Sequence, residues 1–257
     1  MVVLVNKVLE KLAFRRMLSR WTRWADDAPA MGLGQLRRLR DEARALRRQV
    51  DRLLHEADHR LTLPAIGTTK VRRPAGTDWA WRPAPWRAAI PLPGAAGVSG
   101  RETLHDGVTL FHDCGLSEIS YRQVRNTREA DMAPFGLSLE VFRFDGSYLS
   151  LVLDLPPEGA DGLLLRHLVR VDAIVDTERP IEVYVRLNIK HGPNVEQVVR
   201  KLPLDSDETM VEFDLTYTKV VEKRIEKLWL DLIFDGPEMN QIVLRDLSVS
   251  RRPRAEV

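Results

Sequence analysis

The sequence predicts a mainly β protein, an antiparallel jelly-roll-like β-sandwich preceded by a basic N-terminal arm of α-helix and coiled coil. Two observations indicate this fold class. After residue 105, short segments of apolar and β-branched residues recur with turn residues between them. Before residue 62, apolar residues recur at helical spacing among many arginines. We therefore expect an arm over residues 1–61, a Pro- and Trp-rich strap over 62–104 and the sandwich over 105–257.

The first helix is predicted over residues 3–25, where apolar side chains form one stripe with basic side chains on its flanks. A basic amphipathic helix with Trp at its edge can lie in a membrane interface or dock into a protein groove. We predict that the arm contacts an anionic membrane surface or a protein partner, through Lys7, Lys11, Arg15, Arg16, Arg20, Trp21, Arg23 and Trp24.

The second helix carries apolar residues spaced alternately three and four apart, as in a coiled coil. This spacing predicts a short coiled coil, a hairpin with the first helix, or a homo-oligomer through the heptad positions Leu36, Leu39, Ala43, Leu46, Val50, Leu53 and Ala57. Nucleic acid is not the expected partner, because acidic residues interrupt the arginines and no aromatic residues accompany them.

Charge is distributed unevenly along the chain. Residues 1–75 contain 17 Lys and Arg against 8 Asp and Glu, whereas the remaining residues contain 22 against 29, for an overall charge of +2. A basic arm on an acidic body indicates an anionic partner for the arm, or an arm that folds back onto its own body.

Composition excludes several classes of protein. One cysteine among 257 residues rules out a disulfide framework and a cysteine-based zinc site. No stretch approaches the roughly 20 apolar residues that span a bilayer, and the first residues are apolar before they are basic, the reverse of a secretory signal. The expected location is cytoplasmic, with a peripheral position at the inner membrane as one alternative.

The strap combines six prolines with three tryptophans. The prolines make regular structure improbable, and Trp79, Trp81 and Trp86 are too apolar for a free tether. We expect an extended strap whose tryptophans pack on the sandwich. The alternative is that Trp79 and Trp81 stack on sugar rings.

The sandwich is predicted from strands with alternating apolar residues, such as Leu149, Leu151 and Leu153 on one face. Asp145 and Gly146 predict a hairpin turn, and residues 157–167 have room for one helical turn. The ten expected strands are 108–112, 118–124, 137–144, 148–155, 168–175, 181–189, 196–202, 210–217, 227–234 and 241–250.

The outward positions of two strands form the candidate binding site. Tyr184, Arg186 and Asn188 alternate along one strand, and Trp229 and Asp231 along another. Aromatic rings stack on the C–H faces of sugars, while guanidinium, amide and carboxylate groups bind hydroxyls. We expect a glycan site here if the two strands share a sheet; the alternative is an ordinary solvated sheet face.

Catalytic motifs are absent from the sequence. His112 and Cys114 are the one His–Cys neighbourhood, and we expect a structural thiol there. The loop 235–240 has oxygen donors that could bind a structural calcium, but its spacing matches no EF-hand. No cofactor or metal site is therefore predicted.

Several segments resemble an uncharacterised family from Rhodobacter-like alphaproteobacteria, known as a domain of unknown function. The resemblance covers the whole chain and implies a bacterial source and no assigned activity. The strands from Trp229 to Arg251 are also similar in pattern to those of carbohydrate-binding β-sandwich modules. The segments that carry the family resemblance are Gly76–Pro83, Arg125–Asp131, Ala133–Gly136, Phe142–Ser147, Leu187–Asn194, Gly236–Asn240 and Ser250–Ala255.

Three hypotheses follow from these patterns. The first is a non-catalytic binding or scaffold protein whose sandwich is held at a membrane surface or in an assembly by the arm. The second is a carbohydrate-binding module. The third is a hydrolase acting on polysaccharide, which requires two carboxylates about 5 to 9.5 Å apart across a groove.

Overall fold

The structure is a computed structural model that describes residues 2–66, 71, 73–128, 131–204 and 209–254. Within the two long helices, the side chains of residues 2–10, 51, 52 and 54–66 lie outside this description. The chain forms two compact units, Met1–Leu54 and His55–Val257. The first unit is helical, and the second contains the strands.

The N-terminal residues are helical, as predicted. Helix α1 spans Val2–Asp27, a short 3₁₀ turn η1 spans Ala28–Ala30, and helix α2 begins at Leu33 and ends at Ile66. Pro29 lies in the turn between the helices, where its missing N–H costs no helical hydrogen bond. In the described part of the chain, neither long helix has a stretch apolar enough to cross a membrane.

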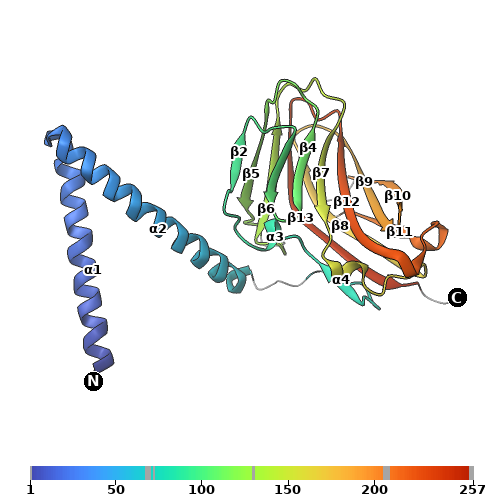
Figure 1. Cartoon of the computed structure of the whole chain (residues 1–257), viewed down its shortest axis with the longest axis horizontal. Helices are drawn as coiled ribbons and strands as arrows, with labels where there is room; N and C mark the ends of the chain where they lie inside the picture. The colour runs from blue at the N-terminus through green and yellow to red at the C-terminus, as the bar shows by residue number, and fades with distance from the viewer. Residues whose placement is uncertain (1, 67–70, 72, 129–130, 205–208, 255–257) are drawn as a thin grey trace. The chain divides into compact units, whose positions relative to one another are not determined.

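The second unit is a β-sandwich of two antiparallel sheets that face each other in Figure 1. Across the first, seven-stranded sheet the order is β11 (Thr209–Asp214), β8 (His167–Thr177), β13 (Asn240–Pro253), β6 (Phe135–Val141), β5 (Ile119–Arg125) and β2 (Gly94–Ala96), with β1 (Trp79–Trp81) also paired to β13. The six-stranded sheet has the order β10 (Asn194–Lys201), β9 (Glu182–His191), β12 (Ile225–Asp235), β7 (Leu149–Asp154), β4 (Val108–His112) and β3 (Arg101–His105). The predicted mainly β, antiparallel sandwich is confirmed.

Period-2 alternation places the core between the sheets. Leu149, Leu151 and Leu153 of β7 are fully buried, as are the alternate residues Val185 and Leu187 of β9. The intervening residues of each strand point away from the core. Short helices occupy the connections: α3 (Ala84–Arg87), α4 (Pro157–Ala160), η2 (Leu215–Tyr217) and η3 (Glu222–Arg224).

From Trp79 onward, the strap is part of the sandwich. Its tryptophans pack as predicted, because Trp86 is fully buried and Trp79 and Trp81 are half-buried against the core. However, the expectation that the prolines make regular structure improbable is wrong, since this segment supplies β1, α3, β2 and the start of β3. The prolines lie beside these elements, and Pro85 lies in the first turn of α3, where proline is tolerated.

Strand β13 changes its pairing at Arg245. Between Leu244 and Asp246 its register against β8 shifts by one residue, and its pairing with β6 ends at Leu244. The strap fills this position: the indole Nε1 of Trp86 donates to the Leu244 carbonyl at 2.8 Å. Arg82 forms two hydrogen bonds with the Asp246 carboxylate, at 2.8 and 2.7 Å. The strap therefore contacts β13 on both sides of the bulge, through the Leu244 carbonyl and the Asp246 carboxylate.

The predicted hairpin at Asp145 and Gly146 is wrong. The loop joins β6 in one sheet to β7 in the other, so the strands on either side do not pair. The loop is instead held by carboxylate contacts with the loop at residues 113–116. Asp145 Oδ1 accepts from the Gly115 N–H at 2.8 Å, and Asp113 accepts from the backbone and hydroxyl of Ser147.

Candidate ligand-binding site

The two strands that carry the predicted site residues are neighbours. Strands β9 and β12 pair antiparallel, with Trp229 opposite Asn188 and Asp231 opposite Arg186. Residues directly opposite each other in a ladder have side chains on the same face of the sheet. Tyr184 lies further along the same face, opposite Ile233. We call this surface, defined by Tyr184, Arg186, Asn188, Trp229 and Asp231, the six-stranded face.

A hydrogen-bonded network lies at the centre of the six-stranded face. Asp231 Oδ2 accepts from Arg186 Nε at 2.6 Å and from Asn188 Nδ2 at 2.9 Å. The Asn188 and Asp231 residues are only 0% and 2% exposed, whereas the Arg186 side chain is 35% exposed. The two buried residues therefore hold Arg186 in position, and the guanidinium is the group of this network that a ligand can reach.

Aromatic rings lie on either side of this guanidinium along the strands. Trp229 and Tyr184 are both half-buried, so part of each ring is available for contact. Lys227 Nζ lies 5.9 Å from the centre of the Trp229 ring and forms an ion pair with Asp154 at 2.7 Å. The ammonium group therefore lies within cation–π distance of the indole.

Charged groups surround the tyrosine at the other end. The Tyr184 hydroxyl donates to Glu182 Oε2 at 2.5 Å, and Lys201 Nζ lies 2.7 Å from Glu182 Oε1. Lys201 and then Tyr184 hold the pKa of Glu182 below its usual range. The same carboxylate raises the pKa of Tyr184, mainly through the hydrogen bond. The phenol is therefore neutral at physiological pH and its oxygen can still accept a hydrogen bond.

Two residues of the site were not predicted. Gln197 Nε2 donates to Asn188 Oδ1 at 2.9 Å, and Lys227 lies beside Trp229. The hairpin around Gly192 places residue 197 opposite residue 188, and Lys227 lies two residues before Trp229 on the same face. The turn and the alternation were therefore signals that could have identified both residues.

The geometry around Cys114 does not form a thiol–base pair. His112 accepts from the Cys114 backbone N–H at 3.2 Å through Nδ1, and its Nε2 lies 3.2 Å from the Val98 carbonyl. Neither ring nitrogen faces the thiol as a base, and Cys114 is 6% exposed. Among the described residues, no group of three or more His, Cys, Asp or Glu is placed to hold a metal ion.

The predicted contact residues of the arm lie on α1. Its basic members with described side chains are exposed, and Trp21 and Trp24 are half-buried against each other, with ring centres 5.1 Å apart. Arg20 lies over the Trp24 ring at 4.9 Å. The backbone of Lys7 is in α1, but its side chain lies outside the described residues.

The fold defines this chain as a two-sheet antiparallel β-sandwich protein with a helical N-terminal unit. The chain belongs to the family of unknown function DUF6478, whose sequence profile matches residues 1–257. No curated protein has a matching sequence.

Solved structures that show some similarity to this chain include proteins named for carbohydrates. A family 11 carbohydrate-binding module from Clostridium thermocellum, in complex with a mixed-linked tetrasaccharide, is 12% identical with a TM-score of 0.39; the match covers 66% of this chain and 100% of the module. A xylan-binding domain from Paenibacillus barcinonensis is 10% identical with a TM-score of 0.35, over 65% of this chain and 97% of that one. Tailspike protein 4 of bacteriophage CBA120 is 7% identical with a TM-score of 0.40, over 55% of this chain and 19% of the tailspike chain. The tetrasaccharide and the xylan are ligands of those proteins.

Proposed function

We propose that this protein is a non-catalytic binding protein whose six-stranded face binds a carbohydrate chain. The observation that carries the proposal is the arrangement of Trp229, Arg186 and Tyr184 along two paired strands. Stacking on the half-exposed rings and hydrogen bonds from the guanidinium match the two kinds of surface that a sugar offers.

The buried network supports a binding role for Arg186. Asp231 fixes the guanidinium through Nε, Asn188 donates to Asp231, and Gln197 donates to Asn188. A side chain that is already ordered loses little conformational entropy when a ligand binds, and this raises affinity. The Nη groups of Arg186 then remain as donors for hydroxyls.

A glycan array with the full-length protein tests the proposal. Trp229→Ala should weaken binding to the recognised glycan at least tenfold, because it removes the larger stacking surface. Tyr217→Ala is the matched control: this aromatic residue is 81% exposed in η2 and lies outside the six-stranded face. Binding to no glycan by the wild-type protein, or equal loss in both variants, would contradict the proposal.

A second function is supported by the surface of α1. Phe14 and Leu18 lie four residues apart, hence on one face of the helix, and are 58% and 55% exposed, with the exposed Arg15 beside them. Exposed apolar side chains among cations suit an anionic bilayer, where the apolar groups enter the interface and the cations meet phosphates. We infer that the arm tethers the protein to the cytoplasmic leaflet of the inner membrane. The protein would then act as a scaffold that holds the ligand of the sandwich at this membrane.

Vesicle co-sedimentation tests the tether. The full-length protein should pellet with vesicles containing phosphatidylserine and should be released by salt, because the attraction is screened. Replacing Arg15, Arg16, Arg20 and Arg23 by Gln should abolish pelleting, while the same number of changes on α2, at Arg37, Arg38, Arg44 and Arg48, should reduce it less. If no vesicles pellet the protein, the arm contacts a protein partner or a second copy instead, and the measured oligomeric state separates these two.

A further inference from the structure

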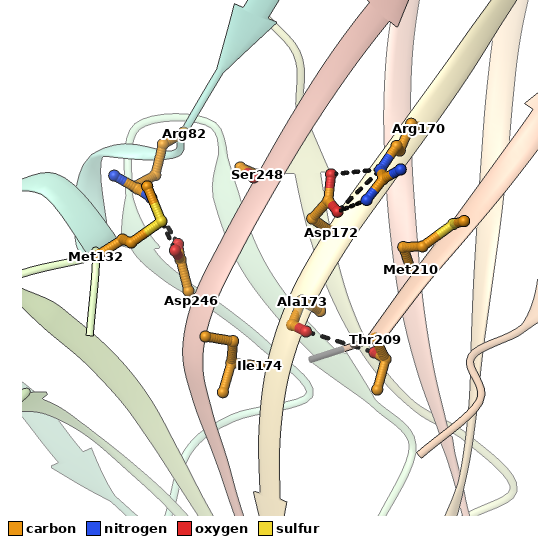
Figure 2. A pocket seen from close by; sticks show the side chains of 10 residues that line it. All are labelled: Arg82, Met132, Arg170, Asp172, Ala173, Ile174, Thr209, Met210, Asp246 and Ser248. Carbon is orange, nitrogen blue, oxygen red and sulfur yellow. Dashed lines mark hydrogen bonds and ion pairs between the residues drawn. The ribbon is translucent and has the colours of Figure 1, made fainter. Parts of the chain in front are cut away.

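A hollow lies on the outer face of the seven-stranded sheet, the sheet opposite the six-stranded face. It is a cavity of about 110 Å³ over strands β8, β11 and β13, bordered by Arg82 of the strap and by Met132. Figure 2 shows that Ser248, Asp172 and Asp246 surround the space, with Met210 at its edge. None of these residues belongs to the six-stranded face.

The walls of the cavity contain two ion pairs. Arg82 forms an ion pair with Asp246, and the Arg82 side chain is 1% exposed. Arg170 contacts both oxygens of Asp172 through Nε, at 2.9 Å each, and these side chains are 25% and 17% exposed. Two cations therefore balance two anions, and a ligand with a net charge would leave one charge unmatched in a partly buried space. The balance favours a neutral ligand.

Several polar groups of the cavity have hydrogen-bonding capacity left. The hydroxyl of Ser248 makes no hydrogen bond with the described residues, although this residue is only 4% exposed. Asp172 Oδ2 accepts one hydrogen bond from Arg170, and a carboxylate oxygen can accept a second. The Nη1 group of Arg170 also has no partner among the described residues. The cavity thus offers donors and acceptors at the same time, which is what a hydroxyl group requires.

The remaining walls are apolar and adaptable. Met132 and Met210 approach from different segments, and Ile174 and Ala173 line the strand. Thioether side chains fit irregular apolar surfaces well. A cavity of about 150 Å³ in another protein is large enough for one benzene molecule. The space here is smaller but open at one side, so it suits part of a single six-membered ring whose other edge faces solvent.

We propose that this cavity, between Asp172, Ser248 and the methionines Met132 and Met210, binds one neutral polyhydroxylated six-membered ring, such as a monosaccharide or a cyclitol. Hydroxyls bind Asp172, Arg170 and Ser248, and the C–H face of the ring packs on the thioethers. This site is separate from the six-stranded face and does not depend on the function proposed for it.

Saturation-transfer NMR with the full-length protein tests the site, using D-glucose, D-xylose and myo-inositol as probes. The wild-type protein should transfer saturation to at least one probe, with a dissociation constant on the order of 1 mM for so small a ligand. Ser248→Leu, which fills the cavity, should weaken binding at least tenfold. Met210→Trp should act in the same direction at the cavity's edge, and since Met210 is 41% exposed this variant tolerates the added volume.

Trp229→Ala distinguishes this site from the six-stranded face. Binding of the probe should be unchanged in this variant even if binding of longer glycans is lost. No transfer to any probe in the wild-type protein would overturn the proposal. So would binding that survives both Ser248→Leu and Met210→Trp, or that is lost in Trp229→Ala, because the ring would then be bound elsewhere.

Discussion

The indole Nε1 of Trp86 donates a hydrogen bond to the carbonyl of Leu244, where strand β13 leaves its pairing with β6. The two residues are 158 positions apart in the sequence. Leu244 is the last residue of β13 that pairs with β6, directly before the register shift at Arg245. The strap is thereby joined to the centre of the seven-stranded sheet.

Substitution of Trp86 should destabilise the sandwich. Trp86→Ala removes a fully buried ring and should lower the free energy of unfolding by about 3–5 kcal/mol. Trp86→Phe keeps most of the ring but leaves the Leu244 carbonyl without its donor, which should cost about 1–3 kcal/mol. Urea unfolding measures both, with Phe142→Leu as control at a side chain that is 55% exposed. Equal stability of Trp86→Phe and wild type would show that water replaces the bond.

The pair between Arg82 and Asp246 should contribute more than an exposed pair of the same type. Arg82→Met leaves the Asp246 carboxylate buried without its main partner and should cost about 3–5 kcal/mol. Arg122→Met breaks an ion pair with Glu140 whose side chains are 61% and 30% exposed, and should cost less than about 1 kcal/mol. The two variants are compared by thermal and urea unfolding. Similar losses would mean that Arg82 acts through packing and not through charge.

The strands of the sandwich were predictable because one face of each is buried. Leu149, Leu151 and Leu153 are apolar at every second position, the alternation that is typical of a half-buried strand. Strand β7 forms there. Strands β1 and β2 have three residues each and lie among prolines. They exist because β13 and β5 offer them free edges, which is a tertiary effect that local sequence does not encode. The alternation of Trp79, Ala80 and Trp81 was the available signal for β1.

The candidate site was predictable in its residue types but not in its contacts. Alternation placed Arg186 and Trp229 on outward faces, but sheet order decides whether two strands more than forty residues apart are neighbours. Burial of Asn188 and Asp231 beneath longer side chains depends on that order as well. The cavity on the other sheet was not predicted, because Arg82 and Asp246 are 164 residues apart and meet only through the bulge.

His167 should make the stability of the sandwich depend on pH. Burial lowers the pKa of this imidazole below its ordinary 6.5, although Asp78, 3.4 Å from Nε2, acts in the opposite direction. As pH falls through 6.5, the unfolded chain binds a proton that the folded protein does not yet accept, so the free energy of unfolding decreases. The free energy of unfolding stops decreasing only when the pH is below the pKa of His167 in the folded protein.

Urea midpoints at about pH 7.5 and about pH 5.5 measure this effect. His167→Gln should show a smaller decrease between the two pH values than the wild-type protein. The variant lacks the imidazole that binds a proton more readily in the unfolded chain than in the folded protein. His105→Gln, at a half-buried histidine near the β3–β4 turn, is the control and should keep the wild-type decrease. A decrease that is the same in all three proteins would assign the pH dependence to other groups.

Asp231 should link the stability of the six-stranded face to its binding. Asp231→Ala removes the nearest acceptor of the fully buried Asn188 amide, at 2.9 Å, and leaves it the longer contacts with the carbonyls of Arg186 and Trp229, so the substitution should cost about 1 kcal/mol. It also releases the Nε contact of Arg186, so glycan binding should weaken even though Asp231 itself cannot reach a ligand. Asp154→Ala is the matched control on the same face, since its ion pair with Lys227 is about half exposed and should be worth less than about 1 kcal/mol.

Urea unfolding and titration with the glycan recognised on the array separate the two effects of Asp231→Ala. Arg186→Ala should reproduce the loss of binding with a smaller loss of stability, because its side chain is partly exposed. If Asp231→Ala lowers stability while binding stays at the wild-type level, then Arg186 does not contact the ligand. In that case stacking on Trp229 and Tyr184 must supply the affinity, because these two aromatic side chains flank the same position on β9 and β12.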